Sequence, residues 1–465
     1  MPSPKLFVLP VAALLASCSM DPAYQVPVTP APAVAYPETG PWTPAIPADD
    51  APRGPWWQVF NDTTLDGLEN RIETGNAQLA GTLARYDQAT ALSRQAQAGL
   101  SPALSVNASD SRTRDPRNGE LTNYSIGAAA SYELDLWGRV RNTVTAGRAN
   151  AEASAADLAG TRLSLQAKLA ETYVSLRGLD AQIALLQQTV DAYNRALDLT
   201  RNRFTGGAAS EIDVGRARTQ LGTTQAQLEQ AKASRTLLEH AVAVLVGEQP
   251  SQFSLTAVDT ALDVPHVPVD APSTLLQRRP DIAAAERRVQ SANASIGVAR
   301  AALFPGITLN AGIGTEELSG SEGPYWALGP LALNLPVLDG GARKARIAGA
   351  RAEFDAAAAA YRQTVLTAFQ DVGDQLSLAN GLAMAANHED EAVSAATRTN
   401  ALATIQYKEG AASYLDVVTA QTAELDARRT ALSLHTSRLL AAVDLIRALG
   451  GGWQNAADAP AAVGS

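Results

Sequence analysis

Apolar residues recur at helical spacing through two long parts of the chain. In the first, ten positions alternate in steps of four and three, and nine of the ten are apolar: Leu165, Leu169, Thr172, Leu176, Leu179, Ile183, Leu186, Val190, Tyr193 and Leu197. This heptad pattern is typical of a helix packed along a neighbouring helix. It predicts one helix over about 141–204 and a counterpart over about 343–407.

Shorter helical patterns flank the two long ones. They predict helices over 76–99, 211–246, 279–302 and 414–449, with Pro280 at a first helical position, where its missing N–H costs nothing. The lengths suggest that helix 211–246 stacks end to end on a helix at about 273–303. Helix 414–449 would then stack on the first short helix. A proline-rich excursion over 248–272 separates the first pair.

Beyond Pro102 and Pro305 the period changes from helical to two. Leu104, Val106 and Ala108 alternate with polar residues, and a similar alternation covers 307–311 and 326–335. These patterns predict two β-hairpins with strands of about ten residues, the length that crosses a bilayer in a tilted barrel. Soluble hairpins fit the pattern equally well. Four strands cannot close a barrel, so a membrane location would require two, three or four copies of the chain.

The chain also contains an internal repeat. The octet GAASEIDV at Gly207–Val214 recurs as GAASYLDV at Gly410–Val417, and other landmarks follow the same offset of 203 residues. A constant offset predicts two copies of one structural unit. We therefore divide the chain into a first repeat over 56–260, a second over 261–455, and a flexible tail over 456–465.

Composition and charge exclude several functions. Only 5% of residues are aromatic, and the net charge of −10 is spread without a basic block, which argues against nucleic-acid binding. The four histidines, His240, His266, His388 and His435, have no ligand spacing, so we predict no metal and no cofactor. No constellation of nucleophile and base indicates an enzyme.

The N-terminus has the pattern of a secretory signal. A short positive segment is followed by eleven apolar residues, too few to span a bilayer as a helix, and then by Leu15-Ala16-Ser17-Cys18. That ending is similar to a bacterial lipobox, which predicts a signal peptide over 1–17 and a lipid on Cys18, the only cysteine of the chain. Residues 18–55 contain many prolines and predict an extended linker. An ordinary signal with an incidental cysteine is the alternative.

The repeated octets predict two tight turns between helices. The small residues of the two turns are Gly206, Gly207, Ala208, Ala209, Ser210, Gly410, Ala411, Ala412 and Ser413. Glycine permits positive φ there, and each serine precedes Asp213 or Asp416 by three positions, the spacing of a capping box. Helix capping alone would explain both aspartates.

Several motifs, in this order and spacing, resemble the TolC-like outer-membrane efflux factor family, and more closely its NodT-like lipoprotein branch. They are Trp56-Trp57…Phe60, Asp135-Leu136-Trp137-Gly138-Arg139, Arg279-Pro280-Asp281-Ile282, Ala299-Arg300-Ala301…Phe304-Pro305, Pro336-Val337-Leu338-Asp339-Gly340-Gly341 and Tyr414-Leu415-Asp416-Val417. The resemblance covers the chain from Cys18 to about Gly451.

The resemblance implies a mixed α and β membrane protein. A trimer would form a 12-stranded transmembrane β-barrel that continues as a coiled-coil α-helical barrel in the periplasm. The two turns would face a periplasmic adaptor, and Asp213, Asp416, Tyr407 and Arg203 would form a periplasmic gate. Thr419 occupies a position where relatives often carry a second acidic residue, which argues against a two-tier acidic constriction.

We therefore predict a lipid-anchored outer-membrane exit duct that works with a periplasmic adaptor and an inner-membrane pump. It would pass drugs or other small molecules to the exterior without chemistry of its own. A structural coiled-coil envelope lipoprotein is the alternative, although it gives no reason for the hairpins or the duplicated turns.

Overall fold

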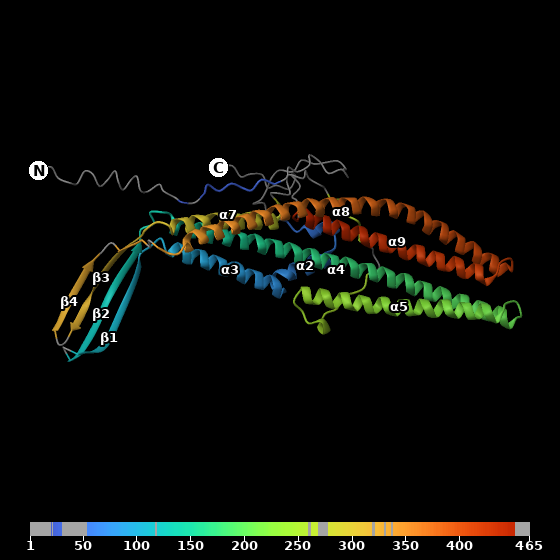
Figure 1. Cartoon of the computed structure of the whole chain (residues 1–465). Coiled ribbons are helices and arrows are strands. Elements are labelled where there is room, and N and C mark those ends of the chain that lie inside the picture. Colours follow the sequence, from blue (N-terminus) through green and yellow to red (C-terminus); the bar gives the residue numbers. More distant parts are fainter. Residues whose placement is uncertain are drawn as a thin grey trace, which may run out of the picture. The chain divides into compact units, whose positions relative to one another are not determined.

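The computed structural model describes residues 20, 22–29, 54–116, 119–258, 262–267, 278–318, 321–329, 332–335 and 338–451 (Figure 1). The predicted signal peptide, Cys18, most of the linker and the tail over 456–465 lie outside these residues. The chain divides into two compact units, which are described separately. One contains the described parts of 1–30, 83–158 and 281–365, and the other those of 31–82, 159–280 and 366–465.

Both predicted long helices are confirmed. They are α4 (Arg139–Thr205) and α8 (Ala342–Glu409). Eight of the ten heptad positions of α4 are buried, and only Leu179 and Ile183 are half-buried. The seam therefore packs as the spacing predicts, because apolar side chains at alternating steps of four and three share one face of a helix.

The shorter helices include the four that were predicted and three that were not. They are η2 (Trp56–Phe60), α2 (Thr63–Gly75), α3 (Ala77–Ala98), α5 (Glu211–Leu245), η3 (Pro250–Gln252), α7 (Pro280–Ala301) and α9 (Tyr414–Ala448). The 3-10 helices η2 and η3 were not predicted, and the longest helix that was not predicted is α2. The side chain of Asp62 caps its N-terminus by accepting from the N–H groups of Thr64 and Leu65 at 2.8 and 3.0 Å.

The predicted end-to-end stacking of the short helices is wrong. The end of α5 meets the start of α3, where the Asn76 side chain donates to the Leu245 carbonyl at 2.7 Å. The end of α9 meets the start of α7, where a Cβ on Gly450 would lie 2.9 Å from the Arg278 carbonyl oxygen. Helix α5 therefore stacks on α3, and α9 stacks on α7. Glycines permit the first junction, because a Cβ on Gly75 would lie 2.1 Å from the Val246 oxygen.

The strands form one antiparallel sheet in the order β1-β2-β3-β4, with β5 also paired to β3. The strands are β1 (Ala103–Asp115), β2 (Gly119–Glu133), β3 (Gly306–Leu318), β4 (Ser321–Leu328) and β5 (Ala332–Asn334). The last predicted strand is interrupted between β4 and β5. Gly329 there has a positive φ of 69°, and the next residue is Pro330, which has no N–H to donate to a ladder.

Two short segments without helix or strand follow η3, and side chains of the second unit hold both. Asp180 is 2% exposed and accepts from Arg177 and Arg235 at 2.9 and 2.6 Å. The same arginines donate to the carbonyls of Thr256 and Leu255. Further along, the Leu262 carbonyl lies 2.9 Å from His435 Nε2 on α9. We call the described residues 253–258 and 262–267 the belt.

Candidate channel surfaces

The sheet has two chemically different faces. Residues paired across an antiparallel ladder point to the same face, so the register assigns every described side chain. One face carries large apolar side chains that are mostly exposed: Leu104, Val106, Ile126, Leu309, Ile313, Trp326, Leu328 and Leu333. Trp326 and Leu328 are 79% and 81% exposed. A folded chain rarely exposes so large an apolar patch to water, so this face marks an interaction surface.

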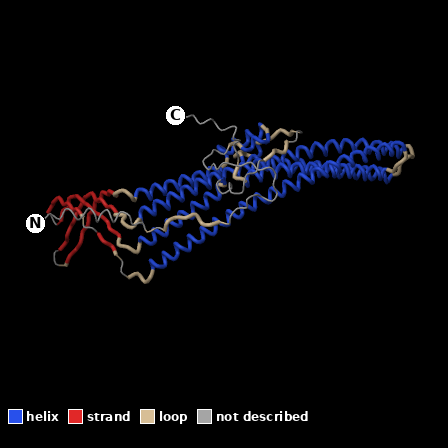
Figure 2. The backbone as a smooth tube through the Cα atoms, turned by 90° about the horizontal axis from the view of Figure 1, so that it is seen from above, coloured by secondary structure: helices blue, strands red, loops and turns tan. Residues whose placement is uncertain are grey.

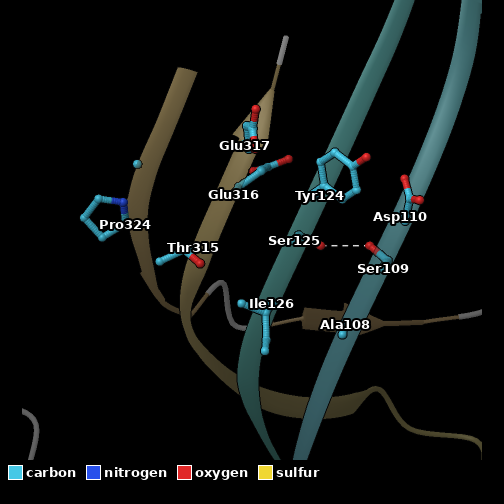
Figure 3. Close-up of a pocket in the computed structure, with 11 residues that line it drawn as sticks. Ala108, Ser109, Asp110, Tyr124, Ser125, Ile126, Thr315, Glu316, Glu317 and Pro324 are labelled. Atoms are coloured by element: carbon cyan, nitrogen blue, oxygen red, sulfur yellow. Dashed lines mark hydrogen bonds between the residues drawn. The ribbon is translucent and has the colours of Figure 1, made fainter. Parts of the chain in front are cut away.

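The opposite face is polar and lined by small residues. The register places Ser105, Asn107, Ser109, Ser125 and Asn310 on it. The hydroxyls of Ser109 and Ser125 lie 2.8 Å apart, as the dashed line in Figure 3 shows. A hollow of about 700 Å³ across β1 to β4 is lined by these two serines together with residues that the register places on the apolar face, among them Tyr124, Ile126 and Thr315.

Tyr325 is an aromatic side chain on the polar face and is 40% exposed. Its ring lies over the glycines of the two neighbouring strands. A Cβ on Gly127 would lie 2.5 Å from the Tyr325 hydroxyl, and a Cβ on Gly314 would lie 2.9 Å from its ring. The glycines therefore make room for Tyr325 on this face.

The two predicted turns have matching backbones. Gly207 and Gly410 have φ of 72° and 82°, the left-handed region that favours glycine. The Ala208 N–H donates to the Arg203 carbonyl at 2.7 Å, and the Ala411 N–H donates to the Gln406 carbonyl at 2.8 Å. Figure 2 shows the two turns side by side at one end of the second unit. Their small side chains are exposed or half-buried.

Both predicted capping boxes are present. The Ser210 hydroxyl accepts from the Asp213 N–H at 3.2 Å, and the Ser210 N–H donates to the Asp213 carboxylate at 3.1 Å. Ser413 and Asp416 repeat the arrangement at 3.4 and 2.9 Å. Hydrogen bonds from the Ser413 hydroxyl and backbone lower the pKa of Asp416, so this carboxylate stays ionised. Both aspartates are thus helix caps in the single chain.

Arg203 joins the two turns. Its Nη1 donates to the carbonyls of Tyr407 and Lys408 at 2.8 and 3.1 Å, in the last turn of α8. Its guanidinium lies 4.6 Å from the centre of the Tyr407 ring, which packs 5.3 Å from the Tyr414 ring. The end of α4 is thereby fixed to the end of α8 by hydrogen bonds and a cation–π contact.

The structure brings all the predicted turn and gate residues together within the second unit. Tyr407 is only 5% exposed, so its ring belongs to the packed interior of the turns. Sequence reasoning missed Tyr414, which is 3% exposed and whose pKa burial raises to about 12. It also missed the exposed side chains of Ile212 and Leu415 beside the turns. The sequence could have pointed to Ile212 and Leu415, because they occupy matching positions in the two octets.

Two further observations concern the described residues. No helix among them combines the length and the apolar character that a membrane crossing needs. No group of three or more His, Cys, Asp or Glu side chains in the described part of the chain could hold a metal ion.

A sheet with one apolar and one polar face, carried on long paired helices, defines the class of outer-membrane channels. The sequence profile described as "Outer membrane efflux protein" matches residues 68–248 and 271–451. The chain belongs to this family, and it is the outer-membrane exit channel of an efflux system.

Individual relatives agree over almost the whole length. The chain is 32% identical to the probable efflux pump outer membrane protein TtgC of Pseudomonas putida, covering 95% of this chain and 94% of that protein. It is 31% identical to the outer membrane protein OprJ of Pseudomonas aeruginosa, with 95% of each covered. Among solved structures, the outer-membrane channel OprN matches with a TM-score of 0.85 at 30% identity, covering 94% of this chain and all of that one. These relatives are channel proteins of the outer membrane, mostly helical with some sheet.

Proposed function

We propose that three copies of this chain form a passive duct through the outer membrane and the periplasm. The observation that carries the proposal is the sheet, whose apolar face is exposed and whose edge strands each have one side without a partner strand among the described residues. Open edges cannot exist in lipid, so the sheet must close with other copies. β4 and β5 both pair with β3, so each copy contributes four strand positions. Three copies then give a 12-stranded barrel with the polar face inside. A merely structural coiled-coil lipoprotein gives no reason for such a sheet.

The height of the apolar face supports a membrane location. It extends along β3 from Ile307 to the level of Tyr124 and Glu317, which the register pairs. Ten residues of strand span about 34 Å. A tilt of about 40° reduces this to about 26 Å, close to the apolar band of outer-membrane barrels. Tyr132 and Tyr124 lie near the two ends of the band, where aromatic side chains prefer the membrane interface.

Two matching halves support the predicted duplication. The two segments matched by the family profile, 68–248 and 271–451, are separated by 203 residues at both ends. Three pairs of glycines with positive φ follow the same offset: Gly138 and Gly341, Gly207 and Gly410, and Gly247 and Gly450. Repeats over 56–260 and 261–455 would give each copy two hairpins and two turns, and a trimer six turns.

The six turns would receive a periplasmic adaptor, which connects the duct to an inner-membrane pump. The exposed small residues of the turns let adaptor helices approach closely, as small residues do in helix packing. Asp213 and Asp416 follow the turns directly, so a trimer would bring six carboxylates near one mouth and favour cations there. Drugs or other small molecules are the proposed cargo, in keeping with two relatives of Pseudomonas putida that are named as outer membrane proteins of an antibiotic efflux pump and of a toluene efflux pump.

The trimer can be tested directly. The purified chain should run as a detergent-resistant oligomer of about 140 kDa for three copies of a 48.5 kDa chain, and it should conduct ions in planar bilayers. Mass by light scattering and single-channel recording check the two expectations. A stable, non-conducting monomer in mild detergent would exclude the barrel.

A lipid on Cys18 would anchor the chain beside the barrel. Met20, Pro22 and Tyr24 lie along α7 in the opposite direction: Arg300 donates to the Met20 carbonyl, Asn293 to that of Pro22, and the Tyr24 hydroxyl to Glu286. The chain therefore runs toward the end of α7 that leads into β3 as it approaches Cys18. Cys18 is two positions before Met20 in the sequence, and two residues span at most about 7 Å.

Substituting the lipid-bearing cysteine should separate anchoring from channel formation. We expect Cys18→Ser to abolish incorporation of a labelled fatty acid and to reduce, without abolishing, the amount of trimer, because the barrel itself holds the membrane. Metabolic labelling and membrane fractionation measure both. An unlabelled wild-type chain would refute the lipobox interpretation.

The Arg203 contacts should hold the periplasmic mouth closed. We expect Arg203→Ala to raise single-channel conductance at least about twofold, because it removes two charge-assisted hydrogen bonds and a cation–π contact. Arg201→Ala is the matched control, since Arg201 lies at the same helix end and pairs with Asp198 of its own helix at 3.6 Å. Equal conductance of the two variants would show that Arg203 only stabilises the turns.

A further inference from the structure

A groove of about 660 Å³ lies between α4, α5 and α9 in the second unit, and the duct function does not explain it. Ser175 and Gln182 of α4, Leu238 of α5, and Arg429, Ser433 and Ser437 of α9 are among its lining residues. Gly178 lets α9 approach at this point, because a Cβ there would lie 2.5 Å from the Thr436 hydroxyl. The volume is within the range of about 300–1,000 Å³ of pockets that bind small molecules.

The groove lies on the side of the helices opposite to the belt. On α4 the belt is held by Arg177 and Asp180, whereas Ser175 and Gln182 line the groove. At about 100° per residue, the two pairs are centred roughly 180° apart around α4. On α9 His435 holds the belt, and Ser433 and Ser437 point about 160° away from it.

Because the groove and the belt lie on opposite sides of the helices, we assign the groove to the wall of the tunnel. This assignment rests on the proposed duct. The belt follows an irregular path across the helices, and a segment of this kind inside the tunnel would obstruct it. The belt therefore lies outside and the groove inside. The groove is about 40 Å from the turns, since 27 residues of α4 separate Gly178 from Thr205.

The groove offers both polar and apolar contacts. The Nε of Arg429 is buried and has no hydrogen-bond partner among the described residues. Asp426 lies one helical turn before it and also lines the groove. The hydroxyls of Thr430 and Thr436 donate to carbonyls of their own helix, so their oxygens remain available as acceptors. Leu179, Leu238 and Leu440 supply apolar surface.

From this arrangement we infer that the groove binds small zwitterionic amphiphiles during their passage through the duct. Arg429 would donate to an anionic or carbonyl group of the molecule, Asp426 would pair with its cationic group, and the leucines would cover its apolar part. Such a site must be weak enough to release its ligand, as in other conducting pores. The site would concentrate amphipathic cargo at the level of the belt.

A fluorescent zwitterionic quinolone is a suitable probe, with the purified full-length trimer in detergent. We expect saturable binding by fluorescence anisotropy, and crosslinks of an azide derivative to α4 and α9. Arg429→Gln should raise the Kd about tenfold, the size of one charge-assisted hydrogen bond. A Ser433→Leu and Ser437→Leu double variant should abolish binding, because leucine side chains would fill the groove.

Arg438→Gln is the matched control, because Arg438 lies on the opposite side of α9, about 140° from the centre of the groove. Its affinity should equal that of the wild type. Equal affinity of Arg429→Gln and wild type, or no saturable binding to the trimer, would overturn the proposal. Saturable binding would also be absent if a neighbouring copy filled the groove, and that too would overturn the proposal.

Conductance in planar bilayers separates this proposal from the duct itself. A wild-type protein that conducts but does not bind the quinolone would refute the groove and leave the duct intact. A protein that binds in an Arg429-dependent manner but never conducts would refute the placement of the groove in a tunnel wall.

Discussion

Ala411→Trp should abolish export while the level of trimer stays normal. Ala411 is exposed in the turn between α8 and α9 and directly follows Gly410. A tryptophan at this position would occupy the surface that an adaptor helix is proposed to approach, and its indole would keep the two backbones apart. Accumulation of a fluorescent dye should rise to the level of a deletion strain. Ala208→Trp, in the matching turn between α4 and α5, should act in the same way.

The alanine is a better site than the adjacent glycine. Gly410 has a φ of 82°, so any side chain there strains the backbone by about 1–2 kcal/mol even though no neighbour lies within 4 Å of an added Cβ. A Gly410 variant would therefore confound docking with turn stability. Ala411→Ser is the matched control, because it keeps the side chain small. Normal export by Ala411→Trp, with trimer present, would show that the turns are not the docking surface.

The turns also show how far sequence reasoning reaches. The capping boxes were predictable because Ser210 and Asp213, like Ser413 and Asp416, are neighbours in sequence. The contact of Arg203 with Tyr407 depends on how α4 packs beside α8, and the spacing of residues within one helix does not contain that information. The sequence placed both residues at the mouth, whereas the structure pairs them and buries the tyrosine.

The prediction of how the short helices stack was wrong for a related reason. Helix length alone does not decide the stacking, because the short helices α3 and α7 both contain 22 residues. Either one could therefore have continued α5. The deciding feature is local: Gly75 and Gly247 let two backbones come within contact distance. In the sequence, a glycine that lets two backbones approach looks the same as a glycine that ends a helix. Both Gly75 and Gly247 lie at helix ends.

The burial of Glu69 on helix α2 could not be predicted from the sequence, because the acidic residues of this helix look like a solvated face. Asp66, Glu69 and Glu73 are spaced by three and four, which is ordinary for an exposed stripe. In the structure, however, Glu69 is 0% exposed, and neither of its carboxylate oxygens has a hydrogen-bond partner among the described residues. Burial, with the neighbouring charges of Asp66 and Glu73, raises the pKa of Glu69 to about 9.

Glu69 should make the protein less stable as pH rises. The folded state holds the proton up to about pH 9, whereas the unfolded chain releases it near 4.5. Between these values the folded state binds more protons, so each pH unit lowers the free energy of unfolding by up to about 1.4 kcal/mol per chain. Below pH 4.5 this contribution is constant. Thermal unfolding followed by circular dichroism from pH 5 to 9 measures the slope.

Glu69→Gln should remove most of that slope and raise the unfolding temperature most at pH 9, because a neutral amide carries no charge to bury. The nearest paired charges stay in place: Arg162 contacts Glu73 at 2.7 Å, and Arg71 contacts Glu248. Glu73→Gln is therefore the matched control on the same helix. It should keep most of the wild-type slope, because burial is the largest cause of the raised pKa of Glu69, and Glu73 is 38% exposed and already paired. If Glu69→Gln and wild type lose stability in parallel between pH 5 and 9, Glu69 is ionised in the folded protein and must have found a partner in the assembled trimer.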